Sequence, residues 1–344
     1  MTDALQQLAA RVCAAKEDAT PLYVHGGNTK KNLLGRTCSV ERTLDISKYR
    51  GISHYQPQEL VISARAGTPI SELESALAEQ GQMLPFEPPR YAGQATIGGT
   101  LAGNLSGPGR PWLGSIRDSV LGVQLINGSG QILKFGGKVM KNVAGYDVSR
   151  LQAGALGTLG VICEVHLKVL PLPEASVTLA RDTSPDEALA LMTNYAGQPK
   201  PLTGACWVNG KLYLRLAGAA SAVEHTAQIW GGDRVDGAIW TQLQDMTHSF
   251  FTPSAELWRL ATTPTAPCSD QADQCIDWGG SQRWLRTPPA SIPQGAHLNL
   301  FSGGDRQTEV RGKLDQVQQT LQLRLKKAFD PAGILNPGRL YSWM

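Results

Sequence analysis

Three glycine-bearing clusters carry the clearest chemical signal in this sequence. They are Gly26-Gly27-Asn28-Thr29-Lys30, the run from Thr96, Ile97, Gly98 and Gly99 to Gly103, Asn104 and Gly107, and the run that contains Gly157, Thr158 and Gly160. Glycine has no Cβ and adopts positive φ easily, so its backbone approaches a ligand closely. Successive N–H groups in such a loop form a concavity that binds an anion. The clusters therefore predict a site for a phosphate-bearing ligand.

Glycine is also the default residue of tight turns, so any one cluster is equally compatible with a plain connection between strands. The occurrence of three clusters in one chain favours binding. Neither Gly-x-Gly-x-x-Gly nor Gly-x-x-x-x-Gly-Lys-Ser/Thr occurs in the sequence. Their absence argues against a doubly wound NAD-binding fold and against a kinase-like fold.

Strands and short helices are predicted between the glycine clusters. Residues 60–66 have the pattern of a strand, and Thr68 and Pro69 then suit the N-cap and first position of a helix. Residues 120–126 and 131–135 are two short runs joined by Asn-Gly-Ser-Gly, which predicts a hairpin. Alternate residues are apolar in 161–170, the period of a strand with one buried face.

The chain is expected to fold as an α+β protein with two domains. Residues 1–173 form the first predicted domain, because Pro171 and Pro173 end the last clear strand. Residues 174–300 form a smaller cap domain on the substrate side. Residues 301–344 are predicted to return to the first domain as a helix and tail. Apolar residues recur there at helical spacing, namely Val310, Leu314, Val317, Leu321, Leu325 and Ala328.

Composition excludes several classes of protein. The net charge is +3 and the basic residues are scattered among acids, so no footprint for nucleic acid is present. No apolar run approaches the ~18 residues of a membrane span, and residues 1–10 lack the features of a secretion signal. The six cysteines show no Cys-x-x-Cys pair, so they are expected to be reduced thiols that hold no iron–sulfur cluster. A cytoplasmic location follows, with any membrane contact made through partner chains.

The motifs resemble a family of flavoproteins. Residues 22–30, 60–89, 96–118 and 136–162 are similar to the FAD-binding domain of the vanillyl-alcohol oxidase and p-cresol methylhydroxylase (PCMH) superfamily, and 329–339 resemble its C-terminal signature. Within it, the chain is most similar to the FAD-binding E subunits of bacterial glycolate oxidases, also called glycolate dehydrogenases. That similarity rests on motifs along nearly the whole chain: residues 82–89, 109–118, 135–147 and 277–285.

The resemblance implies a PCMH-type fold in which FAD lies extended between two subdomains. Backbone amides of Gly26, Gly27, Asn28, Thr29 and Lys30 would hold the diphosphate. Most members of the superfamily have a third glycine where this chain has Asn28. The other cofactor-binding residues that the resemblance implies are Thr96, Ile97, Gly98, Gly99, Gly103, Asn104, Gly107, Ser115, Arg117, Asp118, Gly157, Thr158, Gly160, Ile162 and Asn336.

The FAD is expected to be bound without a covalent link. His25 and His166 are the candidates for a tether, but a loop histidine is more often solvated or bonded to backbone, and His166 falls on the polar face of its strand. No cluster of His and acidic residues suggests a catalytic metal.

The implied chemistry is the oxidation of glycolate, or a similar small 2-hydroxy acid, to glyoxylate or its analogue. A base takes the hydroxyl proton and cationic groups hold the carboxylate. Arg283 and His297 are the candidates for carboxylate anchor and base. The alternative is that Arg283 is a structural partner of an acid or of Trp278 or Trp284, and that His297 is an ordinary surface residue.

The resemblance also implies two partners, a larger FAD subunit and an iron–sulfur subunit that accepts the electrons. Two alternatives stay open at this point. The chain could act alone as a 2-hydroxy-acid oxidase of the D-lactate type, or it could be a non-catalytic scaffold that binds FAD only for stability.

Overall fold

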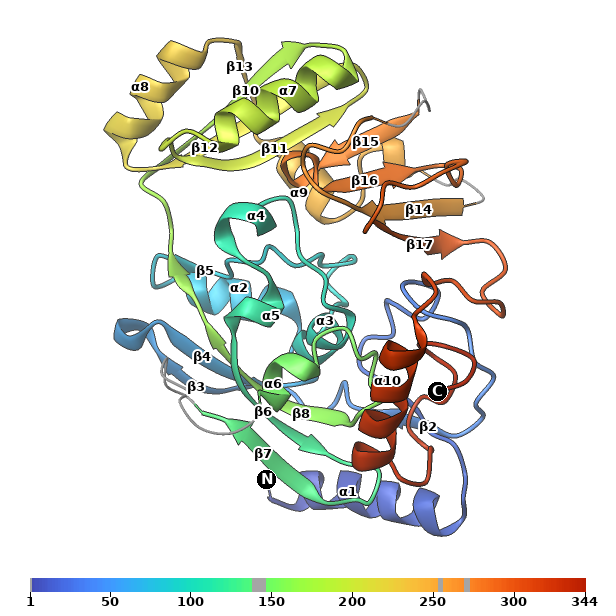
Figure 1. The fold of residues 1–344 in the computed structure, drawn as a ribbon. Helices are drawn as coiled ribbons and strands as arrows, with labels where there is room; N and C mark the ends of the chain where they lie inside the picture. Colours follow the sequence, from blue (N-terminus) through green and yellow to red (C-terminus); the bar gives the residue numbers. More distant parts are fainter. Residues whose placement is uncertain (1, 138–146, 253–255, 269–272) are drawn as a thin grey trace. The chain divides into compact units, whose positions relative to one another are not determined.

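The computed structural model describes residues 2–137, 147–252, 256–268 and 273–344. The chain divides into two compact units (Figure 1). Unit 1 consists of residues 1–105, 115–171 and 305–344, and unit 2 consists of residues 106–114 and 172–304. Part of the motif at 135–147, from residue 138 to residue 146, lies outside the described residues.

Unit 1 is built on a five-stranded antiparallel sheet. Its order is β3 (Ile52–Gln56), β4 (Val61–Arg65), β8 (Val161–Lys168), β6 (Val120–Ile126) and β7 (Ile132–Gly136). The predicted hairpin is confirmed as β6–β7, and its turn is closed by hydrogen bonds between Asn127 and Gln131. The predicted alternation is confirmed in β8, where Cys163, Val165 and Leu167 are buried and the residues between them are half-buried.

The helices of unit 1 are α1 (Thr2–Glu17), α2 (Ile70–Ala78), α3 (Ile97–Gly103), α5 (Ile116–Ser119), α6 (Val148–Leu151) and α10 (Gln316–Phe329). The remaining elements are β1 (Tyr23–His25) paired with β2 (Thr43–Asp45), β5 (Gln82–Met83) paired with β9 (Leu170–Pro171), and the 3₁₀ turn Pro57–Glu59. The prediction of Thr68 as N-cap is wrong, because Pro69 occupies that position. The Thr68 hydroxyl instead donates to the Arg65 carbonyl and accepts from the Gly51 amide.

Unit 2 is an eight-stranded sheet with helices packed against it. The strand order is β13 (Asp233–Val235), β10 (Ala175–Asp182), β12 (Lys211–Gly218), β11 (Leu202–Val208), β15 (Gln274–Asp277), β16 (Gln282–Leu285), β14 (Glu256–Ala261) and β17 (His297–Gly303). The helices are α4 (Arg110–Leu113), α7 (Pro185–Ala196), α8 (Ala220–Trp230) and α9 (Ala238–Gln244), with 3₁₀ turns at Ser249–Phe251 and Trp278–Gly280.

Residues 106–114 pack with unit 2, although the sequence placed them in the first domain. The indole of Trp278 donates to the Gly107 carbonyl at 2.9 Å, and the Arg110 guanidinium lies 4.3 Å from the centre of the Trp278 ring. An indole N–H and a ring face thus hold this segment in unit 2. The residue pattern of 106–114 alone does not indicate that this segment packs with unit 2.

The C-terminal segment returns to unit 1, where a buried ion pair holds it. The Lys326 ammonium, buried at the end of α10, donates to the Asp330 carboxylate at 2.7 Å and to the carbonyls of Thr158 and Leu335 at 2.9 and 2.7 Å. Asp330 also accepts from the amides of Ile334 and Leu335. We call this set, Lys326, Asp330 and residues 334–336, the C-terminal anchor.

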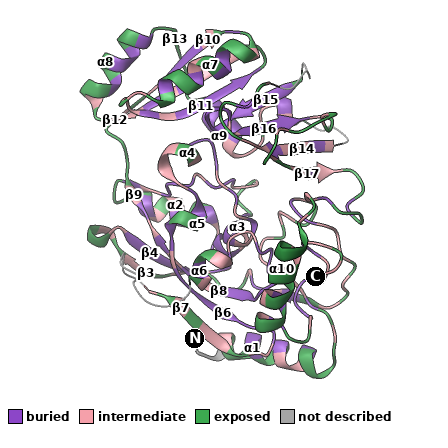
Figure 2. Cartoon of the chain, viewed as in Figure 1, coloured by how far each residue is buried: buried purple, intermediate pink, exposed green. Residues whose placement is uncertain are grey.

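The apolar positions of α10 differ from the expectation. The helix begins at Gln316, so Val310 and Leu314 precede it, and Val310 is buried. Val317 and Leu321 are exposed rather than packed (Figure 2). The ion pair of Lys326, the buried residue of this helix, sets the side of α10 that faces the protein.

Replacing Lys326 by Met should lower the free energy of unfolding by about 3–5 kcal/mol, because it leaves the buried Asp330 carboxylate without its counterion. Urea denaturation measures the loss. Lys327→Met is the matched control, since Lys327 is the exposed neighbour in the same helix. Equal free energies of unfolding of the two variants would contradict the expected contribution of this ion pair to stability.

Candidate functional site

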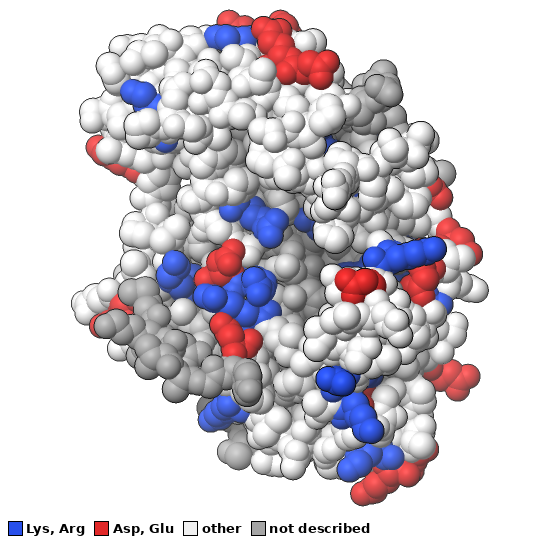
Figure 3. All heavy atoms as spheres, in the orientation of Figure 1, with Lys and Arg blue, Asp and Glu red and all other residues white. Residues whose placement is uncertain are grey.

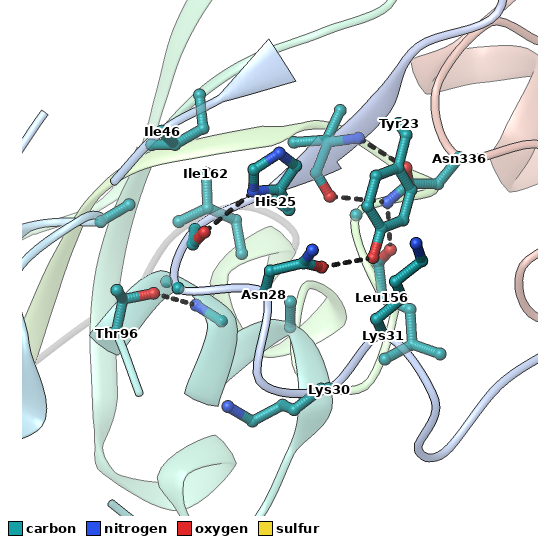
Figure 4. A pocket seen from close by; sticks show the side chains of 18 of the residues that line it. Tyr23, His25, Asn28, Lys30, Lys31, Ile46, Thr96, Leu156, Ile162 and Asn336 are labelled. Carbon is teal, nitrogen blue, oxygen red and sulfur yellow. Dashed lines mark hydrogen bonds between the residues drawn. The ribbon is translucent and has the colours of Figure 1, made fainter. Parts of the chain in front are cut away.

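The three glycine clusters meet in unit 1 around one pocket. It encloses about 730 Å³ of space between protein atoms, part of which is open to solvent. Its predicted lining residues are Gly26, Gly27, Asn28, Thr29, Lys30, Thr96, Gly98, Gly99, Gly157, Gly160, Ile162 and Asn336 (Figure 4). Sequence segments more than 100 residues apart thus come together as the prediction required.

The first loop leaves β1 and passes closely over the segment before α3. A Cβ on Gly27 would stand 1.8 Å from the Gln94 carbonyl oxygen, and one on Gly26 would stand 2.5 Å from the Thr96 hydroxyl. Real Cβ atoms do not approach other atoms so closely, so both positions require glycine. The loop backbone therefore lies directly against the start of α3, and both line the pocket.

Asn28 takes the place of a third glycine. Its φ is +54°, in the left-handed region, where Asn is better tolerated than most residues. Its side-chain oxygen accepts a hydrogen bond from the Tyr23 hydroxyl at 2.8 Å. This bond, drawn in Figure 4, fixes the turn without blocking the backbone.

Asn336 joins three segments of the pocket wall. Its side-chain oxygen accepts from the Val24 amide at 2.7 Å, and its side-chain nitrogen donates to the carbonyls of Leu156 and Val24 at 2.7 and 3.3 Å. Its φ of +42° is another left-handed position. A Cβ on Gly157, whose φ is +73°, would stand 2.8 Å from the Asn336 side-chain nitrogen. The amide of Asn336 is therefore a structural component of the pocket.

Arg339 fixes the segment that follows the first loop. Its guanidinium donates to the carbonyls of Lys30 at 2.6 Å and Leu33 at 3.0 Å, and also to the carbonyl of Arg36. Burial lowers the pKa of Arg339 below its ordinary value. Arg339 is not among the predicted site residues, although its place just after Asn336-Pro337-Gly338 is a usable signal.

Lys30 places a positive charge in the pocket wall. Its ammonium lies 5.1 Å from the centre of the Tyr91 ring and donates to the Thr29 hydroxyl at 3.1 Å. Among the residues that the structure describes, no carboxylate forms an ion pair with it. Burial lowers its pKa from 10.5 to about 8. A Cβ on Gly103 would stand 3.2 Å from Cδ of Lys30, so glycine leaves room for this side chain.

Seven predicted cofactor residues of unit 1 do not line this pocket: Ile97, Gly103, Asn104, Ser115, Arg117, Asp118 and Thr158. Ser115 and Asp118 form a reciprocal capping box at the start of α5, and Arg117 is exposed. Thr158 is buried, and its hydroxyl donates to the Ala155 carbonyl at 2.7 Å. Asn104 ends α3 in a left-handed conformation. Gly107 belongs to unit 2.

The pocket also has lining residues that sequence reasoning missed, among them Tyr23, Lys31, Ile46, Ala66, Ala102 and Leu156. Small and apolar side chains such as Ala66 and Ile46 show no chemical signal in a sequence. They contact the pocket only because the fold brings β2, β4 and α3 together.

Arg283 is buried and hydrogen bonded to backbone. It is only 2% exposed, and its guanidinium donates to the carbonyls of Gly280, Ala266 and Pro267. These contacts lie within unit 2 and agree with the alternative of a structural role, although the hydrogen-bond acceptors are carbonyls rather than a tryptophan ring. The role of Arg283 as carboxylate anchor stays a prediction.

The three candidate histidines are exposed or hydrogen bonded to neighbouring protein groups. His297 is exposed at the start of β17, an edge strand of the unit 2 sheet, so its role as base stays a prediction. His25 lines the pocket, and its Nδ1 lies 2.9 Å from the Gly26 carbonyl. The Nδ1 of His166 is hydrogen bonded to the Ser63 hydroxyl at 2.8 Å. Within the described ranges, no group of three or more His, Cys, Asp or Glu could hold a metal ion.

The residues of the pocket fit a dinucleotide. Two glycines that admit no Cβ present a concave backbone, and Lys30 adds a cation that forms no ion pair in the part of the chain that the structure describes. Apolar side chains, including Ile46, Ala66 and Ile162, form another part of the wall. A diphosphate suits the first set and an aromatic ring system suits the second.

Comparisons with known proteins agree with this site. An FAD binding domain family matches residues 3–136. Glycolate oxidase subunit GlcE of Escherichia coli is 43% identical over 99% of this chain and 98% of its own length. Glycolate oxidase subunit GlcD of Bacillus subtilis is 33% identical over 47% of this chain and 34% of its own length. The structure of an alkyldihydroxyacetonephosphate synthase matches with a TM-score of 0.66 at 15% identity, covering 97% of this chain and 75% of that one.

Fold and site together define an FAD-binding flavoprotein with the α+β architecture expected from the sequence. More particularly, the chain belongs to the family of glycolate oxidase subunit GlcE, a family of FAD-dependent oxidoreductase subunits. No helix in the described part of the chain is long and apolar enough to cross a membrane.

Gly27→Ala should weaken FAD binding on the order of 10- to 100-fold, because overpacking costs about 1–3 kcal/mol and the methyl group meets the Gln94 carbonyl. Flavin fluorescence titration of the apoprotein measures the affinity. Gly197→Ala is the control, since a Cβ there meets nothing closer than 3.6 Å. Unchanged affinity in Gly27→Ala would show that this loop does not hold the cofactor.

Lys30→Met should weaken FAD binding about tenfold near neutral pH, because a cation near the diphosphate is lost. In the unaltered protein, affinity should fall as pH rises through about 8, where Lys30 loses its proton. The unfolded chain keeps this proton up to its ordinary pKa of 10.5, so apoprotein stability should rise from pH 8 to 10.5. Lys30→Met should abolish both trends.

Titrations and urea melts between pH 6 and 10.5 test these trends. Lys16→Met removes the same charge from an exposed position on α1, outside the pocket, and should keep both of them. If Lys30→Met behaved like Lys16→Met, the ammonium of Lys30 would not face the cofactor.

Proposed function

We propose that this chain is the FAD-binding subunit of a glycolate dehydrogenase complex, which oxidises glycolate to glyoxylate. The observation that carries the proposal is the match to the E. coli glycolate oxidase subunit over almost the full length of both chains. Shorter matches to a second glycolate oxidase subunit and to D-lactate dehydrogenases support a small 2-hydroxy acid as substrate.

The residues of the pocket would hold FAD without a covalent link. Backbone amides of residues 26–30 would surround the diphosphate, with Lys30 as counter-charge, while the segments at 96–99 and 157–162 would form the walls. When bound, the flavin supplies a two-electron acceptor for a hydride from the substrate carbon. The chain itself orients this acceptor through Asn336 and Arg339 and excludes water with apolar side chains such as Ile162.

Electrons would leave this subunit for an iron–sulfur partner, and a larger FAD subunit would complete the complex. The six cysteines of this chain are free, and none of them is placed in a group suited to a cluster within the described residues. A cytoplasmic location belongs to the same proposal.

Glycolate added anaerobically to the isolated FAD-loaded chain should leave the flavin absorbance unchanged, whereas the reconstituted complex should reduce an artificial acceptor. Stopped-flow absorbance and dye reduction measure the two. Rapid bleaching of the isolated chain, with peroxide formed in air, would instead favour a self-sufficient oxidase.

A complex assembled with Gly27→Ala separates a catalytic flavin from a scaffold. The proposal expects glycolate-driven dye reduction to fall with the flavin content of this subunit, and Gly197→Ala to retain it. Full activity without this flavin would leave only a scaffold role.

A further inference from the structure

The outward face of α10 is apolar where a solvent-facing helix is usually polar. Of the large apolar side chains that are exposed in the described part of the chain, two lie together on this face, Val317 at 69% and Leu321 at 53% exposed, and Leu323 at 46% is exposed on another side of the same helix. Single exposed apolar residues are common, but a cluster of them marks an interaction site.

Helix geometry places Val317 and Leu321 opposite the C-terminal anchor. Val317, Leu321, Arg324 and Ala328 are spaced i, i+4, i+7 and i+11, so they share one face. Lys326 follows Val317 by nine residues, which at about 100° per residue is half a turn away. Because the Lys326 ammonium is fixed by three buried hydrogen bonds, α10 cannot rotate to cover Val317 and Leu321.

The charged side chains of α10 itself are all basic. Arg324 and Lys327 are exposed on α10, and the helix from Gln316 to Phe329 contains no Asp or Glu. Figure 3 shows Lys and Arg side chains beside uncharged surface over this helix. An apolar ridge with basic flanks complements an apolar groove edged by carboxylates.

We propose that the outward face of α10, formed by Val317, Leu321 and Arg324 with Lys327 at its flank, docks a partner subunit through an apolar groove lined at its edge by Asp and Glu. The proposal rests on the proposed function, which makes this chain one subunit of a complex. The occupant is a different chain rather than a second copy, because two copies would bring these like charges together.

Helix length agrees with this kind of contact. The 14 residues of α10 span about 21 Å, enough for a groove to engage the side chains at i, i+4 and i+11. A capping box of Asp315 and Gln318 fixes the first turn, so the ridge is formed before the partner binds. Docking then requires little ordering of this chain.

The test is assembly of the full chain, loaded with FAD, with the co-expressed larger FAD subunit and iron–sulfur subunit of the same organism. Val317→Glu with Leu321→Glu should weaken assembly at least tenfold in analytical ultracentrifugation, and leave FAD content and melting temperature unchanged. The matched control is Ile229→Glu, an equally exposed apolar residue on helix α8. Reversal of Arg324 and Lys327 to Glu should also weaken assembly and remove its sensitivity to salt.

Three results would overturn the proposal. Unchanged assembly of the Val317/Leu321 variant would contradict the proposed docking face and leave the proposed function unaffected. Wild-type binding to phosphatidylglycerol vesicles, or self-association, that is lost in this variant while assembly is kept would assign the face to lipid or to a second copy. Failure of the wild-type chain itself to assemble would overturn the proposed function together with the docking face.

Discussion

The pocket depends on the interaction that fastens the end of the chain to its beginning. Lys326 and Asp330 neutralise each other in a buried position, and together they bind the backbone at Thr158, Ile334 and Leu335. Burying two charges costs free energy unless further hydrogen bonds complete their coordination, as they do here. The ion pair thereby sets the position of Asn336, whose amide then joins β1 to the segment around Gly157.

Charge distribution in unit 1 follows from that arrangement. Arg339 donates its hydrogen bonds to backbone carbonyls, and Lys326 donates to carbonyls and to the Asp330 carboxylate, so both cations stabilise the pocket wall. Within the described ranges, the ammonium of Lys30 contacts a hydroxyl and an aromatic ring and forms no ion pair, so its charge stays available to an anion. This side chain therefore suits a diphosphate, and burial lowers its pKa.

Sequence reasoning could predict the parts of the site that depend on glycine. Gly26 and Gly27 were recognisable because close backbone approach has a compositional signature, and the alternation in β8 identified its buried face. Arg283 lies beyond the reach of such signals, since a lone arginine in a sequence does not reveal whether its guanidinium meets substrate or backbone carbonyls. The same limit applies to α10, where the apolar period gave the helix correctly but not the side that faces the protein. Tertiary hydrogen bonds determine both the contacts of Arg283 and the orientation of α10, and such bonds leave no local pattern in the sequence.

Residues 22–24 and 334–336 are paired across nearly the entire length of the chain. A ribosome makes the first strand long before the asparagine that completes its hydrogen bonding. During synthesis, the glycine loop therefore lacks this wall of the pocket until residues 334–336 have been made. The complete pocket forms only after that point, and a truncation before residue 334 removes the wall as well.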